Sequence, residues 1–204
     1  MAWECVRIYS LLNATYYHDN IINDNLLFST IGIIIVNSHN NIISNNKIEA
    51  GGPHYNSILL HSSNNNIISG NIIRNSGILF YCCNNNVIIE NRISTCDYGI
   101  YLYAVTNSCF FNMITRNVIY SNDIGICLNE VRANIVFENN FLNNTRDVEF
   151  FGSSRNHFIK NYWDRPRILP KLIFGYFWTG YIWIPWFNID WRPALRPYDI
   201  PTGV

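Results

Sequence analysis

Charged residues are scarce in this 204-residue chain, and neither sign predominates. Its 14 lysines and arginines balance 14 aspartates and glutamates, so the formal net charge is zero. Proteins that bind nucleic acid usually carry a basic patch or stripe that attracts the anionic partner. The composition therefore predicts no nucleic-acid partner, and it gives no electrostatic reason to expect binding to an anionic membrane.

The sequence also has no CxxC motif and no visible signal peptide. None of the six cysteines forms a CxxC pair, the spacing typical of a structural zinc site. Met1–Arg7 contains no basic segment followed by an apolar stretch, so no signal peptide is visible. We therefore expect no metal site and no cofactor. The thiols, interpreted as small buried or surface groups, are Cys5, Cys82, Cys83, Cys96, Cys109 and Cys127.

Asparagine and isoleucine, by contrast, recur at a regular spacing. Asn66-Ile67-Ile68-Ser69-Gly70-Asn71-Ile72-Ile73 has the pattern Asn-x-apolar-x-x-Asn-x-apolar, and a further short apolar strand follows it at Gly77-Ile78-Leu79-Phe80. Such a period, roughly 20 to 26 residues, indicates stacked repeats instead of one globular core. Further copies begin at Asn41, Asn86, Asn112, Asn134 and Asn156, with a degenerate copy from Thr15 whose second Asn is Asn20.

A unit of this length is too short for a strand, a crossover helix and a second strand. It suits one coil of a right-handed parallel β-helix, in which each strand pairs with its equivalent one coil away. We predict an all-β fold of about seven coils over residues 1–163, with the chain starting partway through a coil. Placing Ile8 in the column of Ile100 extends the repeat to the first residues.

The repeat also predicts which side chains point inward, because alternate residues of a strand face opposite sides. The two Asn columns are expected at corners, where Asn tolerates left-handed backbone and its amide can bond to the next coil. The predicted inward columns are Ile43, Ile68, Ile88, Ile114, Val136 and Phe158; Ile48, Ile73, Ile93, Ile119, Phe141 and Trp163; Ile33, Ile58, Ile78, Ile100, Ile126 and Val148; and Ile35, Leu60, Phe80, Leu102, Leu128 and Phe150.

The final segment, residues 164–204, has a different character. No residue from Leu172 to Ile189 is charged, and this stretch is just long enough to span a bilayer. Gly175, Gly180 and Pro185 interrupt it, however, and aromatic residues fill its middle. Three interpretations remain open: an aromatic flap packed on the β-helix, an interfacial membrane anchor, and a transmembrane helix. For the flap, we predict that the tail runs down the rod, covers the outer side of the third strands and buries Trp183 or Trp186.

The repeats from about residue 6 to Trp163 resemble those of NosD-like right-handed β-helix proteins, within a wider group of carbohydrate-binding and sugar-hydrolase β-helices. Asn161-Tyr162-Trp163 is similar to the last coil of that family, and the tail from Pro185 resembles C-terminal ends of archaeal members. The resemblance implies an extracellular or cell-surface setting. It also raises a role in copper-site maturation, for which the two methionines and scattered histidines offer few soft ligands.

Two groups of residues are candidates for function. Asp97 and Asp123 each precede a third-strand isoleucine by three residues, so they should stack one coil apart, with Asp147 and Glu149 on the next coil. Two carboxylates about 5 Å apart suit a retaining glycosidase, although Asp before Gly-Ile is also ordinary turn chemistry. The second group, Tyr81, Tyr101 and Tyr103, should lie on the outer side of the third strands and offer ring faces to sugars.

These residues support three hypotheses about function. The first is a non-enzymatic β-helix module that binds carbohydrate or has a structural role at the surface, with a polysaccharide or glycoprotein as partner and Tyr81, Tyr101, Tyr103, Asp147 and Glu149 as binding residues. The second is a glycan-cleaving enzyme that uses Asp97 and Asp123. The third is a copper-site maturation factor.

Overall fold

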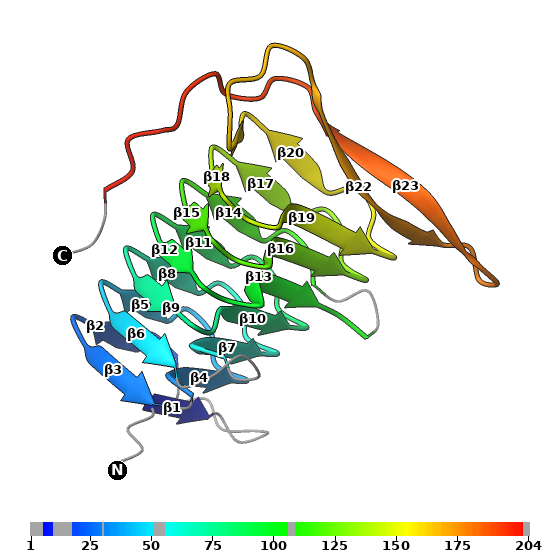
Figure 1. Ribbon diagram of the computed structural model, residues 1–204. Coiled ribbons are helices and arrows are strands. Elements are labelled where there is room, and N and C mark those ends of the chain that lie inside the picture. Colours follow the sequence, from blue (N-terminus) through cyan, green and yellow to red (C-terminus); the bar gives the residue numbers. More distant parts are fainter. Residues whose placement is uncertain (1–5, 10–17, 30, 51–55, 106–108, 202–204) are drawn as a thin grey trace.

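The computed structural model describes residues 6–9, 18–29, 31–50, 56–105 and 109–201, and it is a parallel β-helix (Figure 1). The described residues form 23 strands and no helix. Each complete coil contributes three short strands, one to each of three faces of a rod. Seven strands make up each face, in agreement with the predicted number of coils.

The strands of the first face are β2 (Ile21–Asn23), β5 (Ile42–Ser44), β8 (Ile67–Ser69), β11 (Val87–Ile89), β14 (Met113–Thr115), β17 (Ile135–Phe137) and β20 (His157–Ile159). Those of the second face are β3 (Leu26–Ser29), β6 (Lys47–Ala50), β9 (Ile72–Arg74), β12 (Arg92–Ser94), β15 (Val118–Tyr120), β18 (Asn140–Leu142) and β21 (Tyr162–Trp163). Those of the third face are β1 (Val6–Tyr9), β4 (Ile33–Val36), β7 (Ile58–His61), β10 (Ile78–Tyr81), β13 (Tyr98–Tyr103), β16 (Ile124–Asn129) and β19 (Arg146–Phe151).

The predicted inward columns are confirmed. Ile88 pairs with Ile68 on one side and with Ile114 on the other, and all three side chains are fully buried. Every residue of the four predicted columns is buried in the same way. The core of the rod is therefore a set of parallel stacks in which each side chain lies against its equivalent in the neighbouring coils.

The register predicted for the first coil was wrong. Asn20 is not a second-column residue, because it bonds to Asn41 of the first column. The segment Asn20-Ile21-Ile22-Asn23-Asp24-Asn25-Leu26-Leu27 matches the repeat, whereas Thr15 lies outside the described residues. In β1, Val6 pairs with Ile33 and Ile8 pairs with Ile35. Ile8 therefore lies in the column of Ile35 and not in the predicted column of Ile33 and Ile100.

Two ladders of asparagines run along the corners of the rod, and all their members except Asn20 and Asn25 are buried. In the second ladder the Asn91 Oδ1 atom accepts hydrogen bonds from the backbone N and the Nδ2 atom of Asn71, both at 2.9 Å. The Asn91 Nδ2 atom donates in turn to the carbonyl of Ile68 and to Oδ1 of Asn117. Each amide therefore satisfies polar groups of two neighbouring coils, as predicted. The ladders are Asn20, Asn41, Asn66, Asn86, Asn112, Asn134 and Asn156; and Asn25, Asn46, Asn71, Asn91, Asn117, Asn139 and Asn161.

A C-terminal hairpin closes the end of the rod. β22 (Lys171–Trp178) and β23 (Trp183–Asp190) pair antiparallel, and they link the third face to the first through the pairs Phe151–Tyr176 and Phe158–Asp190. The side chain of Ile173 covers the core and is 2% exposed. Gly175 lies on the Phe150 ring, where an added Cβ would come within 2.6 Å of the ring.

The second Asn ladder ends in the hairpin at Asp190, which is fully buried. Its carboxylate accepts hydrogen bonds from the backbone N atoms of Lys160 and Asn161 and from Nε1 of Trp163, at 2.8 to 3.1 Å. An ionised carboxylate accepts hydrogen bonds but has no hydrogen to donate. It therefore suits the last rung, which receives hydrogen bonds from one coil and has no further coil to which it must donate.

The predicted position of the tail was wrong. Trp183 is 46% exposed and Trp186 53% exposed, and the hairpin extends the rod instead of covering the third face. The flap interpretation correctly predicts that residues 172–189 are not a membrane helix, because β22 and β23 form a hairpin there, and no helix able to cross a membrane occurs among the described residues. The free edges of β19 and β20, the last strands of their faces, offer unpaired backbone N–H and C=O groups to a hairpin. The outer side of a sheet offers none.

The residues after the hairpin do pack on the side of the rod (Figure 1). The backbone N of Tyr198 donates to Oδ1 of Asn140 at 2.9 Å, and Nδ2 of Asn140 donates back to the carbonyl of Tyr198 at 2.8 Å. Ile200 is buried. The tail is thus attached to the rod, but at the end and along the second face instead of over the third.

Replacing Ile88 by Asp should unfold the protein, because an unpaired charge would be buried in the middle of a column. The matched control is Ile67→Asp, at a position 40% exposed on the neighbouring strand. We expect the Ile88 variant to lose its strand signal in circular dichroism and the Ile67 variant to keep it. A folded Ile88→Asp protein would contradict the inward register.

Candidate functional site

Five aromatic side chains form a continuous array on the outer side of the third face. Parallel pairing aligns His61 with Tyr81, and Tyr81 with Tyr103. The ring centroids of these two pairs lie 4.8 and 5.4 Å apart. Tyr101 lies 6.0 Å from Tyr103 and 5.0 Å from Tyr98. We call His61, Tyr81, Tyr98, Tyr101 and Tyr103 the aromatic face.

The array follows from the repeat. Neighbouring strands lie about 4.8 Å apart, which is close to the distance at which aromatic rings stack. Aromatic residues at one outward position in successive copies must therefore meet, as His61, Tyr81 and Tyr103 do. Tyr101 joins them from the same strand as Tyr103, two residues earlier. The Asn129 Nδ2 atom donates to the Tyr101 hydroxyl at 3.0 Å and extends the face by one coil. Burial raises the pKa of Tyr98 and Tyr101, so their hydroxyls remain protonated near neutral pH.

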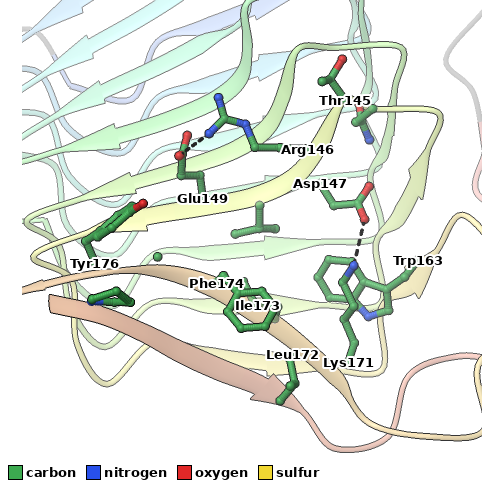
Figure 2. Close-up of a pocket in the computed structure, with 14 residues that line it drawn as sticks. Thr145, Arg146, Asp147, Glu149, Trp163, Lys171, Leu172, Ile173, Phe174 and Tyr176 are labelled. Carbon is green, nitrogen blue, oxygen red and sulfur yellow. Dashed lines mark hydrogen bonds and ion pairs between the residues drawn. The ribbon is translucent and has the colours of Figure 1, made fainter.

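A pocket of about 530 Å³ opens at the end of the rod, between β19 and β22 (Figure 2). These two strands pair only through Phe151 and Tyr176, whose rings stack 5.8 Å apart, so the rest of β22 leaves space beside β19. We call this space the end pocket. Its lining residues include Thr145, Arg146, Asp147, Glu149, Trp163, Lys171, Leu172, Phe174 and Tyr176.

The end pocket combines paired charges with an apolar wall. Lys171 contacts Asp147 at 3.5 Å and lies 5.3 Å from the centre of the Trp163 ring, and Arg146 pairs with Glu149 (Figure 2). Burial raises the pKa of Asp147, and Lys171 partly opposes this shift. Phe174 and Leu172 lie on the opposite side, on the hairpin. The pocket can therefore offer hydrogen-bonding groups and an apolar surface to one ligand without presenting a net charge.

The two predicted pairs of acids lie in different places. Tyr98 pairs with Ile124, so Asp97 and Asp123 occupy equivalent positions in neighbouring coils, as predicted. Asp123 is exposed, Asp97 is partly exposed, and neither lines the end pocket. Asp147 and Glu149 do line it. The position after Asp123 in its column is held by Thr145 instead of Asp147, since Ile124 pairs with Arg146.

The described thiols are free and mostly buried. Burial raises the pKa of Cys96, Cys109 and Cys127 to about 12, and it also raises the pKa of Cys83. These four thiols are therefore protonated near neutral pH, whereas a metal ligand must be a thiolate. Among the described residues no three His, Cys, Asp or Glu side chains come together in a group able to hold a metal ion.

A ladder that the sequence analysis missed begins with two histidines. The Nδ1 atom of His18 accepts the backbone N–H of His39 at 3.1 Å, and Nδ1 of His39 accepts that of Asn64 at 2.9 Å. The two rings stack 5.1 Å apart. Asn64 continues the ladder by accepting the backbone N–H of Asn84. The signal was present in the sequence, because each of these residues lies two positions before an asparagine of the first ladder.

These features place the protein in the class of parallel β-solenoids, with an aromatic array on the outer side of its third face. The sequence pattern of the NosD family, described as "Periplasmic copper-binding protein (NosD)", matches residues 8–183. The chain therefore belongs to the NosD family, and the resemblance drawn from its repeats is confirmed. A comparison with curated proteins found no match.

The histidine ladder predicts a pH-dependent stability. Burial, and then the nearby His18, lower the pKa of His39. The unfolded chain therefore binds the proton more readily, and stability should fall as the pH decreases below about 6.5. Protonation also places a hydrogen on Nδ1, facing the N–H of Asn64. Hydrogen exchange should show β2, β5 and β8 opening more readily at about pH 5.5 than at about pH 7.5.

The matched control is His39→Asn, because Asn64 and Asn84 already fill this role with an amide in later coils. We expect the variant to fold and to lose most of the acid-dependent opening. An unchanged pH dependence in the variant would show that other groups cause it.

Proposed function

We propose that this protein is a non-catalytic β-helix module that binds carbohydrate chains along its aromatic face. The observation that carries the proposal is the continuous array from His61 to Tyr98, in which ring follows ring over neighbouring coils. A polysaccharide has a matching repetition, because its sugar units also follow one another along one axis. Its sugar rings present C–H groups that pack on aromatic side chains.

Polar groups at the border of the array supply orientation. Ligand sites typically combine apolar and aromatic surface with a few placed hydrogen-bonding groups. The protonated hydroxyls of Tyr98 and Tyr101 and the amide of Asn129 fill that role beside the rings. Further along the rod, Phe151 and Tyr176 bring aromatic surface to the edge of the end pocket, where Asp147 and Glu149 accept hydrogen bonds.

The expected location of the protein is one in which such a ligand occurs. The family is described as periplasmic, and we expect this chain in the cell envelope or outside the cell. Polysaccharides and glycoproteins are available there. The neutral net charge of the chain favours an uncharged glycan over a polyanionic one.

A copper site, which the family description suggests, does not fit the described residues. Both His18 and His39 accept a backbone N–H at Nδ1, so the neutral ring carries its hydrogen on Nε2 and offers no second lone pair. The buried thiols are protonated, and Met113 is the one described methionine. Within the described part of the chain, nothing supplies the cluster of soft ligands that copper prefers.

Catalysis by Asp97 and Asp123 is the second candidate function. Their position in neighbouring coils implies a separation near the strand spacing of about 4.8 Å, which resembles that of retaining glycosidases. Tyr98 and the aromatic face adjoin them. Carboxylates at such turns are nevertheless common chemistry, so the release of reducing sugar must be measured together with binding.

We expect the purified protein to bind neutral polysaccharides on a glycan array. Replacing Tyr81 and Tyr101 together by Ala should weaken binding about tenfold or more, since each aromatic contact contributes about 0.5–1.5 kcal/mol beyond area burial. Isothermal titration calorimetry with the best array ligand measures this change.

The matched control is Tyr120→Ala, which removes a tyrosine of the second face that packs on Arg92. This variant should bind as the unaltered protein does. Equal losses in both variants, or no glycan binding at all, would contradict the proposal. Sugar release that disappears in Asp97→Asn, with folding intact, would establish the enzyme instead.

A further inference from the structure

The tip of the C-terminal hairpin projects beyond the side of the rod (Figure 1). The last pairing between β22 and the rod is Tyr176 with Phe151, the final residue of β19. Residues 177–184 extend past this last backbone pairing, although the Trp183 ring still lies 6.4 Å from the Phe151 ring. Six of these eight residues are large and apolar or aromatic: Phe177, Trp178, Tyr181, Ile182, Trp183 and Ile184.

Both sides of the hairpin are apolar. Cross-strand partners share a side, so Trp178 lies beside Trp183 and Phe174 beside Phe187 on the side turned away from the core. These four side chains are 43 to 66% exposed. On the opposite side Phe177 is 38% exposed and Trp186 is 53% exposed. Such a concentration of exposed apolar surface marks a contact site.

The hairpin is also suited to a medium without water. The N–H of Thr179 donates to the carbonyl of Ile182, and the N–H of Ile182 donates to the Thr179 hydroxyl, so the turn satisfies much of its own backbone. No charged residue occurs between Lys171 and Asp190. Exposed charges of both signs follow and precede the hairpin, at Asp164, Arg165, Arg192, Arg196 and Asp199.

We propose that the hairpin is a membrane-interface anchor whose tip lies in the headgroup region of a phospholipid bilayer. Trp and Tyr are the residues that favour the membrane–water interface. The proposal does not depend on glycan binding, and it places the rod at a membrane surface.

Lipid is a better partner here than a second protein surface. A flat protein partner, including a second copy of this chain, covers one side of a hairpin and leaves the other in water. Lipid surrounds an overhanging tip on both sides. An interfacial segment is buried by about 5 to 10 Å, and three residues of a strand at about 3.3 Å each reach that depth. The tip from Trp178 to Trp183 is of this size.

Vesicle flotation tests the proposal with the full chain. The protein should float with phosphatidylcholine vesicles, and adding phosphatidylglycerol should change this little, because the tip carries no charge. The double variant Trp178→Ser/Trp183→Ser should bind at least about tenfold more weakly, since two interfacial anchors are removed. The matched control is Phe111→Ser, which removes a 62% exposed aromatic residue from a corner of the rod and should leave flotation unchanged.

Circular dichroism and glycan binding confirm that the double variant is folded, and the membrane result stands whether or not the protein binds glycan. Failure of the unaltered protein to float with phosphatidylcholine vesicles overturns the proposal. So does flotation that is insensitive to the double substitution. A dimer detected by light scattering, which the double variant abolishes while vesicles bind neither protein, would assign the hairpin to a second copy of the chain.

Discussion

The hydrogen bond between asparagine side chains of successive coils is the interaction on which the rest of the structure depends. A parallel β-helix has a polar backbone corner at each turn of its coil, and a buried amide or carbonyl without a partner costs about 1–3 kcal/mol. Each ladder asparagine accepts from one coil and donates to the next, so one side chain satisfies groups on both sides. The ladder fixes the register between coils, since a shift by one residue would separate every amide from its partner.

The fixed register turns a repeated sequence into repeated surfaces. Inward positions become stacks of isoleucine, and outward positions of the third face become an aromatic array. At the end of the repeat, the same hydrogen-bonding requirement favours a different residue. Asp190 replaces asparagine at the last rung, because an acceptor without a donor is what the end of the ladder requires. The hairpin that carries Asp190 thereby covers the core and forms one wall of the end pocket.

The sequence alone predicted the inward columns, the Asn ladders and the aromatic residues of the third face, because a period imposed by strand pairing determines all three. It predicted Asp97 and Asp123 as neighbours for the same reason. The end pocket was not predictable, because it depends on how β22 diverges from β19 outside the repeat. The predicted position of the tail was wrong for a similar reason. The prediction placed the apolar tail on the apolar outer side of the third face. Instead, the unpaired strand edges at the end of the rod bind the hairpin through backbone hydrogen bonds.

The most direct test of the ladder is the free energy of unfolding of Asn91→Asp, measured in urea near neutral pH. Aspartate has the shape of asparagine and keeps the acceptor for Asn71, but when ionised it cannot donate to Ile68 or Asn117. It also buries a charge between oxygen atoms. We predict a loss of about 3 kcal/mol or more. A change within about 0.5 kcal/mol, the range of ordinary surface substitutions, would contradict the central role of the ladder.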